Sequence, residues 1–176
     1  MLEVSKPEKL ITTYLEMTRR TAFRPAYLDE DSSFVVLRME TVDVPFYRFL
    51  YNAVGEQWRW RDRLLMSDEQ LHTALADPDT TVDVLYVSGV PAGYVELKRE
   101  KEATEIAYFG LRPGYIGRGL GKHLLSWGVA LAWSDGAQRV WLHTCNLDSP
   151  HALDNYLKRG FAIYKVVEEP VPDYYF

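Results

Sequence analysis

The chain has 176 residues, which suits one domain with a hydrophobic core of ordinary size. Hydrophobic residues make up 47% and charged residues 26% of it, values typical of globular proteins, and no apolar run approaches the roughly 20 residues of a membrane span. The net charge of −5 disfavours nucleic acid as the main partner. A single cysteine, Cys145, excludes an internal disulfide and offers no metal cluster.

The first seven residues carry charges at Glu3 and Lys6 and lack an apolar centre, so we expect no secretory signal and a cytoplasmic protein. Apolar runs bounded by breakers predict strands along the rest of the chain. They cover residues 10–17, 34–39, 82–87, 91–97, 104–111, 139–144 and 161–167. A turn at Ser88 and Gly89 joins two of them, and a charged turn over residues 98–102 leads to a third, so these three strands are predicted to be antiparallel.

Helix start and stop signals predict four helices between these strands. Asp43 caps a helix over residues 45–54, and Ser67 with Gln70 forms a capping box before the next. A third helix follows over about 118–134, and Ser149 with Pro150 predicts the start of a fourth that ends at Gly160. Residues 21–33 and 170–176 are expected to be a loop and a tail.

Aromatic and basic residues alternate in Trp58-Arg-Trp-Arg-Asp-Arg63. Three interpretations are open: packing in the core, an aromatic wall for a substrate, or a platform for single-stranded nucleic acid, because aromatic rings and arginine stack on bases. No broader basic face accompanies the motif, which weakens the third interpretation.

Residues 105–125 combine a strand with a glycine-rich turn and the start of a helix. Gly117, Gly119 and Gly121 precede the helix, and Arg118 and Lys122 add positive charge. Free amides and the dipole at a helix N-terminus favour an anion, so the turn is predicted to hold a pyrophosphate, although it could equally pack a helix on a sheet. The spacing matches neither the nucleotide-triphosphate loop nor the dinucleotide fingerprint.

Two motifs carry a family resemblance. Tyr115-Ile-Gly-Arg-Gly-Leu-Gly-Lys-His-Leu-Leu125 resembles the acetyl-CoA motif of GNAT N-acetyltransferases, with Ile116 where that family has Gln or Arg. Ala152 and Tyr156-Leu-Lys-Arg-Gly-Phe161 resemble a second motif of the family, Ala-x-x-x-Tyr-x-x-x-Gly-Phe. The resemblance spans residues 82–167 and implies one GNAT domain over residues 1–176, an α+β fold with a mixed, mostly antiparallel twisted sheet flanked by helices.

The resemblance also implies a cofactor site for acetyl-CoA as co-substrate. Main-chain groups of Phe109, Gly110 and Leu111 would hold the carbonyl and pantetheine arm where two strands splay apart. The pyrophosphate would lie on the turn, formed by Ile116, Gly117, Arg118, Gly119, Leu120, Gly121 and Lys122. Asn146 resembles an asparagine that bonds the pantetheine arm, although the family spacing would put that residue at Ser149, which makes residues 146–149 look like a three-residue extension.

Catalytic roles follow from the same resemblance. Tyr156 matches the family tyrosine that acts as general acid, or it packs at the cofactor edge without chemistry. Glu105 occupies the position of a general base, or it is a surface glutamate, and Glu96 on the neighbouring strand is the rival carboxylate. His143 and His151 are expected to be ordinary polar positions, and no paired spacing of ligands indicates a metal.

The sequence therefore predicts an N-acetyltransferase that acts on a primary amine of a small molecule, with Tyr47, Trp58 and Glu96 at the acceptor pocket. One alternative is acetylation of a protein lysine or N-terminus, which needs an open groove beside Glu105. Another is an acyl-CoA-binding or sensing module without turnover. No membrane partner is expected, and the many aromatic residues are compatible with a homodimer.

Overall fold

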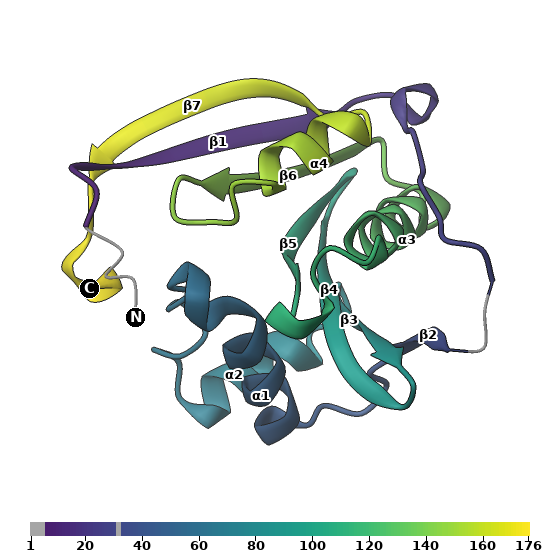
Figure 1. The fold of residues 1–176 in the computed structure, drawn as a ribbon, viewed down its shortest axis with the longest axis horizontal. Coiled ribbons are helices and arrows are strands. Elements are labelled where there is room, and N and C mark those ends of the chain that lie inside the picture. Colours follow the sequence, from purple (N-terminus) through teal and green to yellow (C-terminus); the bar gives the residue numbers. More distant parts are fainter. Residues whose placement is uncertain (1–5, 31–32) are drawn as a thin grey trace.

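The computed structural model describes residues 6–30 and 33–176, which form a seven-stranded sheet in the order β2-β3-β4-β5-β6-β1-β7 (Figure 1). All seven strands lie where the sequence predicts a strand, within a few residues, including the first at residues 10–17. The strands are β1 Lys9–Met17, β2 Phe34–Arg38, β3 Thr80–Val87, β4 Val90–Glu100, β5 Ala103–Leu111, β6 Arg139–Cys145 and β7 Ala162–Pro170. All neighbours are antiparallel except β5 and β6, which confirms a mixed, mostly antiparallel sheet.

Helices cover both faces of the sheet. The α-helices are α1 Val44–Gly55, α2 Asp68–Ala76, α3 Leu120–Ser134 and α4 Ala152–Lys158, and short 3-10 turns are η1 Arg20–Ala22, η2 Glu56–Trp58, η3 Pro113–Tyr115 and η4 Asp173–Tyr175. Apolar side chains of α3 and α4 pack with β1, β4, β5 and β6 in the larger core cluster. Those of α1 and α2 pack on β3 and β4 in a second cluster, so each helix pair has its own core.

The cap signals act as predicted at two helices. The Asp43 carboxylate accepts a hydrogen bond from the Phe46 amide at 2.8 Å and starts α1. Ser67 and Gln70 exchange both bonds of a capping box, at 3.1 and 2.9 Å, and start α2. Such side chains satisfy amides that the first helical turn leaves without acceptors.

The predicted start of the fourth helix is wrong. Ser149 does not cap α4, because His151 occupies the N-cap position, makes no capping bond, and the helix begins at Ala152. Residues 146–151 form turns instead, since the Asp148 carboxylate accepts a hydrogen bond from the Cys145 amide at 3.1 Å. A local side-chain bond of this kind competes with helix formation.

The parallel pair β5 and β6 creates the opening that matters for the site. The two strands pair only over residues 103–105 and 139–141, and beyond this point they diverge (Figure 1). β1 lies antiparallel to β6 on its other side and joins it to β7. One edge of β5 therefore has unpaired backbone groups from residue 106 to residue 111. In the described part of the chain, no helix is both long and apolar enough to span a membrane.

Candidate active site

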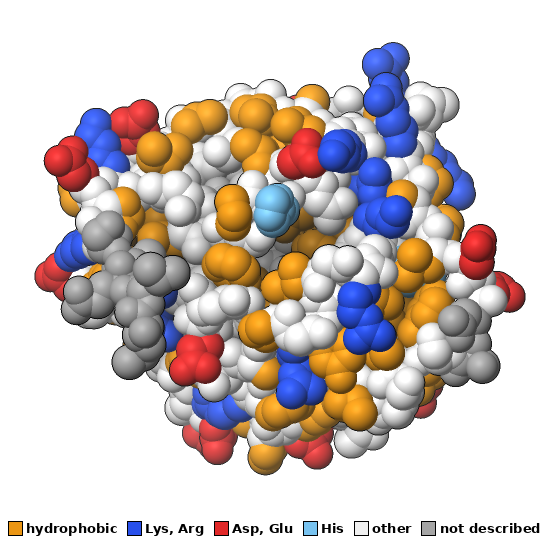
Figure 2. Space-filling view, viewed as in Figure 1, with side chains coloured by type: hydrophobic (Ala, Val, Ile, Leu, Met, Phe, Trp, Pro, Cys, Tyr) orange, Lys and Arg blue, Asp and Glu red, His pale blue; other side chains and the backbone are white. Residues whose placement is uncertain are grey.

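A cavity of about 570 Å³ occupies the opening between β5 and β6. Its walls come from the end of β5, the glycine turn before α3, the start of α4, and residues 58–62 after α1. Figure 2 shows hydrophobic side chains around the middle of this face, flanked by Lys and Arg side chains. The volume lies within the range of roughly 300–1,000 Å³ that is usual for small-molecule sites.

The glycine turn lies at one end of this cavity. Gly117 and Gly119 have φ angles of 83° and 77°, a left-handed conformation that residues with a side chain rarely adopt. Among the described residues, the amides of Gly117, Arg118 and Gly119 donate to no acceptor, and the first amides of α3 have none within the helix. The turn thus offers a row of free donors at the N-terminus of a 15-residue helix.

The predicted cofactor residues do not all reach the cavity. Those that line it are Phe109, Gly110, Leu111, Ile116, Gly117, Gly119, Gly121 and Lys122. Leu120 is instead buried in the core at 4% exposure, and the Arg118 guanidinium lies over the Tyr115 ring, 5.5 Å from its centroid. Either residue can contribute only its backbone amide in this geometry.

Tyr156 lines the cavity from α4 and is 7% exposed. Its ring makes edge contacts with Phe109 on β5 and Phe161 beyond α4, with centroids 6.2 and 6.3 Å apart. Burial, assisted by the charge of Asp148, raises the pKa of the phenol above its ordinary value. The hydroxyl therefore keeps its proton at neutral pH and is available as a donor.

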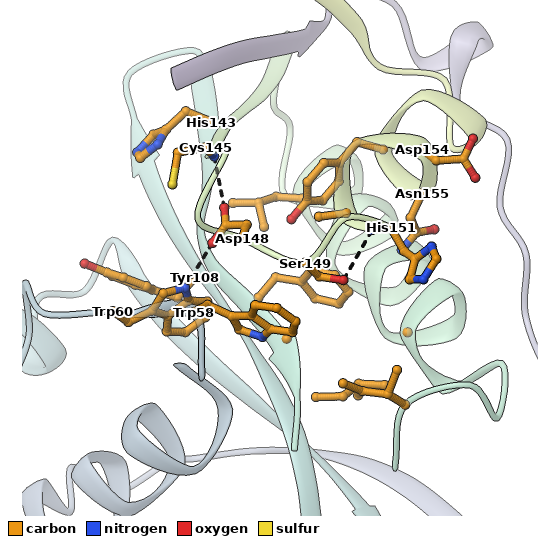
Figure 3. Close-up of a pocket in the computed structure, with 18 of the residues that line it drawn as sticks. Trp58, Trp60, Tyr108, His143, Cys145, Asp148, Ser149, His151, Asp154 and Asn155 are labelled. Atoms are coloured by element: carbon orange, nitrogen blue, oxygen red, sulfur yellow. Dashed lines mark hydrogen bonds between the residues drawn. The ribbon is translucent and has the colours of Figure 1, made fainter. Parts of the chain in front are cut away.

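Tryptophans form the wall opposite β6. Trp58 and Trp60 both line the cavity, and Trp60 also packs on Tyr51 and Tyr108, with centroids 5.4 and 5.5 Å away. Of the three interpretations of the aromatic motif, core packing is seen for Trp60, and the acceptor wall stays a prediction, because neither tryptophan lines the second cavity described below. The indole Nε1 of Trp60 donates to Asp148 at 3.3 Å, and this bond crosses the cavity (Figure 3).

A second cavity of about 430 Å³ lies beside the first, on the face of the sheet that α1 and α2 cover. The charged residues of its lining are Asp62, Arg63, Asp77, Glu96, Lys98 and Glu105. Asp62, Ala107, Tyr108 and His143 line both cavities, so the two meet where β5 and β6 separate.

Glu105 lies in this second cavity with 18% of its side chain exposed. Burial, with the charges of Glu100 and Glu96 adding to it, raises the pKa of this carboxyl to about 7, and Arg63 opposes the shift. A carboxylate with such a pKa can exchange a proton near neutral pH. The His143 imidazole lies beside it, with Nε2 3.8 Å from the carboxylate oxygen Oε1.

Glu96 is not a free carboxylate. One oxygen forms an ion pair with Arg63 and the other accepts a hydrogen bond from the Tyr47 hydroxyl, and its side chain is only 1% exposed. Burial raises the pKa of Glu96, while Arg63 and Tyr47 partly offset this. With both oxygens engaged, Glu96 is a poorer candidate for the base than Glu105.

Two predicted ligand positions need correction. Tyr47 is fully buried at 0% exposure, because it packs in the core and bonds Glu96, so its side chain lies behind the second cavity and does not line it. Asn146 lines neither cavity. Its side chain accepts from the Ile11 amide and donates to the Lys9 carbonyl, both at 2.9 Å, so it fastens β1 to the end of β6.

His143 and Asp148 lie at the site, although the sequence analysis assigned neither of them a role there. His143 was expected to be an ordinary polar position, yet it lines both cavities. Asp148 lies within the three-residue extension that the family spacing reveals, and this insertion was the one signal for it. In the described residues, no group of His, Cys, Asp and Glu is arranged to hold a metal ion.

Residues 47–161 match the family described as the acetyltransferase (GNAT) family. The match covers more than half of the sequence and contains the glycine turn, the divergent strands and Tyr156. The chain belongs to the GNAT family. None of the curated proteins matches the sequence.

Solved structures share this GNAT fold. An acetyltransferase from Novosphingobium aromaticivorans assigned to the GNAT family is 20% identical, with 91% of this chain and 62% of that chain covered and a TM-score of 0.60. An aminoglycoside acetyltransferase from an uncultured soil sample is 17% identical, with coverage of 73% and 88% and a TM-score of 0.61. An IAA acetyltransferase from Bacillus cereus is 24% identical, with coverage of 76% and 79% and a TM-score of 0.58.

Some of the similar structures are longer than this chain. A protein from Staphylococcus epidermidis, with a TM-score of 0.65 and 16% identity, is matched over 90% of this chain but only 59% of its own length. The GNAT chain thus spans about three-fifths of such relatives, and these identities indicate a shared fold.

Proposed function

We propose that this GNAT protein transfers the acetyl group of acetyl-CoA to a primary amine of a small molecule. The observation that carries the proposal is the meeting of the two cavities at Ala107, Tyr108 and His143. A cofactor in the first cavity and an amine in the second would reach each other there, through the opening between β5 and β6. Holding two reactants in this way lowers the entropic cost of their reaction.

The first cavity suits acetyl-CoA at both ends. The free amides of the glycine turn, the dipole of α3 and the Lys122 ammonium suit a pyrophosphate. Along β5, the unpaired backbone groups of Phe109, Gly110 and Leu111 suit the pantetheine arm and the carbonyl oxygen. When bound, acetyl-CoA supplies the thioester, and a backbone donor aimed at its developing oxyanion lowers the barrier by about 3 kcal/mol.

Glu105 is the proposed general base. An amine enters as an ammonium ion, and Glu105 takes one proton from it, which frees the nitrogen lone pair for attack on the thioester carbon. A pKa of about 7 leaves much of this carboxyl deprotonated at neutral pH and still able to bind a proton.

Tyr156 is the proposed general acid. As the C–N bond forms and the C–S bond breaks, its phenol gives a proton to the departing thiolate. The second proton that the acylated nitrogen releases then restores the phenol through water. A buried phenol with a raised pKa is fully protonated before this step, as an acid must be.

The second cavity favours a small, cationic acceptor. Its two basic side chains are already engaged, Arg63 with Glu96 and Lys98 with Asp77, while Glu105 and Asp62 make no ion pair with a lysine or arginine in the described residues. Ala74 of α2 and Asp77, just after that helix, close one side, unlike the open groove that a protein lysine would need. The aminoglycoside acetyltransferase among the similar structures is named for an acceptor rich in amines.

The test begins with binding and ends with turnover. Acetyl-CoA should raise the melting temperature of the purified protein, because a ligand of the folded state stabilises it, whereas NAD should not. Release of free thiol is then measured against a panel of small amines and a lysine peptide. Thiol release with a peptide alone would favour a protein acetyltransferase, and binding without any release would favour the sensing module.

Two glycine variants make the cofactor assignment specific. Gly117→Ala and Gly136→Ala introduce the same left-handed strain, with φ angles of 83° and 93°, and neither new Cβ meets an atom within 4 Å. Both should lose about 1 kcal/mol of stability. Only Gly117→Ala should weaken acetyl-CoA binding, because Gly136 lies at the far end of α3, and equal affinities of the two variants would overturn the phosphate site.

A further inference from the structure

His143 lies on β6 two residues beyond the last residue that pairs with β5. Glu105 is the last paired residue of β5 and lies opposite Trp141, and His143 follows two residues later on the same face of β6. The diverging strands leave the imidazole and the carboxylate facing each other, with Nε2 and Oε1 3.8 Å apart. His143 lines the first cavity (Figure 3) and also the second, so it lies where the proposed reactants meet.

The imidazole is held in place by aromatic rings. Tyr14, directly opposite on β1, has its ring centroid 5.5 Å away, and the Trp141 ring lies at 6.4 Å. These contacts restrict the ring on two sides, and 48% of the side chain still faces solvent or the cavities. A restricted ring with an open edge suits a group that orients a neighbour.

The surrounding charges define what this histidine can do. Desolvation by the cavity walls lowers the pKa of His143, while Asp148 and Asp62 oppose the shift, so the ring is largely neutral at neutral pH. A neutral imidazole carries one N–H donor. In the described residues the Glu105 carboxylate accepts no hydrogen bond, and the His143 imidazole is the polar group that lies beside it.

Other charged groups near Glu105 do not supply that donor. Glu96 and Glu100 repel it from β4, and Arg63 attracts it but is paired with Glu96. Lys98, opposite Glu105 in the β4–β5 register, has its ammonium on Asp77.

We propose that His143 is a positioning residue for Glu105, donating its Nε2–H to the carboxylate and so fixing the base at the junction of the two cavities. At 3.8 Å the contact is longer than a hydrogen bond, and a small movement of either side chain closes it in the free protein as well as with substrates bound. The bond stabilises the carboxylate form of Glu105 against its protonated form. This inference rests on the proposed function, because it assigns the base of that reaction.

The first test measures the protonation of Glu105 directly. Carbon-13 NMR of protein labelled at the glutamate carboxyls gives the pKa of Glu105, with Glu105→Gln to assign the signal. His143→Ala should raise this pKa by about 0.5 to 1 unit, because a donor to the charged form is lost. His143→Gln, which keeps an N–H donor, should restore most of the original value, and His72→Ala, an exposed histidine on α2 outside both cavities, should change nothing.

The second test follows catalysis. The acid limb of kcat/KM for the amine should move up by the same amount in His143→Ala, with a loss of about two- to fivefold at neutral pH and an unchanged affinity for acetyl-CoA. An unmoved Glu105 pKa, or a glutamine variant as impaired as the alanine variant, would overturn the role of His143. If no amine is acetylated while the NMR shift appears, the proposed function fails and the positioning contact stands.

Discussion

Arg63 allows a direct test of the buried ion pair with Glu96 that lines the second cavity. Its guanidinium pairs with Glu96, whose side chain is 1% exposed, against 15% for that of Arg63. Replacing Arg63 by methionine keeps the apolar stem but leaves Glu96 buried without a cation. Breaking a buried ion pair from one side costs about 3–5 kcal/mol. The lower end is expected here, about 3 kcal/mol, because the Tyr47 hydroxyl still bonds the other oxygen of Glu96.

The loss should depend on pH with a definite sign. Burial already raises the pKa of Glu96, and without Arg63 it rises further above its value in the unfolded chain. A carboxyl with a raised folded-state pKa stabilises the folded state at low pH, and this contribution is lost as pH increases through that pKa. Arg63→Met should therefore be closer to the parent protein at about pH 5.5 than at about pH 8.

Urea unfolding and thermal melting at these two pH values measure the effect. For a chain of this size, about 3 kcal/mol corresponds to a fall in melting temperature of about 6–12 °C. Glu96→Gln combined with Arg63→Met should recover most of the loss, because no buried charge then remains. Arg61→Met is the control, since no ion pair of Arg61 exists among the described residues. A loss below about 1 kcal/mol at both pH values, or no recovery in the double variant, would refute the reasoning.

Three further predictions address the base, the chain reversal after α4 and the N-terminal strand. kcat/KM should fall about tenfold per pH unit below the Glu105 pKa of about 7, and a limb that survives in Glu105→Gln would place the base elsewhere. Gly160→Ala puts a Cβ 1.9 Å from the Ala22 carbonyl oxygen at a φ of 104°, so urea titration should show a loss of stability above about 2 kcal/mol. Gly89→Ala, whose Cβ meets no atom within 4 Å, should lose about 1 kcal/mol, and equal losses in the two variants would contradict the clash. Asn146→Ala removes two hydrogen bonds to β1, so it should lower the free energy of unfolding by about 1–2 kcal/mol and speed amide hydrogen exchange in β1. The affinity for acetyl-CoA should stay the same, and weaker binding would support the predicted cofactor role of Asn146.

Local signals in the sequence predicted the fold well where the interaction is local. Asp43 and Ser67 start their helices through bonds to amides only three residues away, and Gly117 and Gly119 take the left-handed conformation that a glycine-rich turn needs. The predicted start of α4 was wrong because of an interaction that is also local in sequence. Ser149 and Pro150 are good starting residues, but the neighbouring Asp148 carboxylate binds the Cys145 amide and stabilises a turn before them.

The parts of the site that the sequence missed depend on contacts between distant segments. The bond from Trp60 to Asp148 joins residues 88 positions apart, and the contact from His143 to Glu105 depends on how far β5 and β6 stay paired. Strand register across a parallel pair follows from tertiary packing, since neither strand alone specifies it. The polar types and their approximate positions were therefore predictable, and their partners were not.

The place of β1 in the sheet shows how distant segments shape the cleft. None of residues 9–17 lines either cavity, yet this strand lies between β6 and β7 and forms the support behind β6. Leu15 and Met17 pack in the core with Tyr156, while Tyr14 on the opposite face contacts the His143 ring. The proposed acid and the proposed positioning residue thus rest on alternate side chains of one strand. β6 has no strand on its open side beyond residue 141, so the width of the cleft there depends on how firmly β1 holds it. The N-terminal strand therefore sets the distance between His143 and Glu105, although it takes no part in binding the substrates.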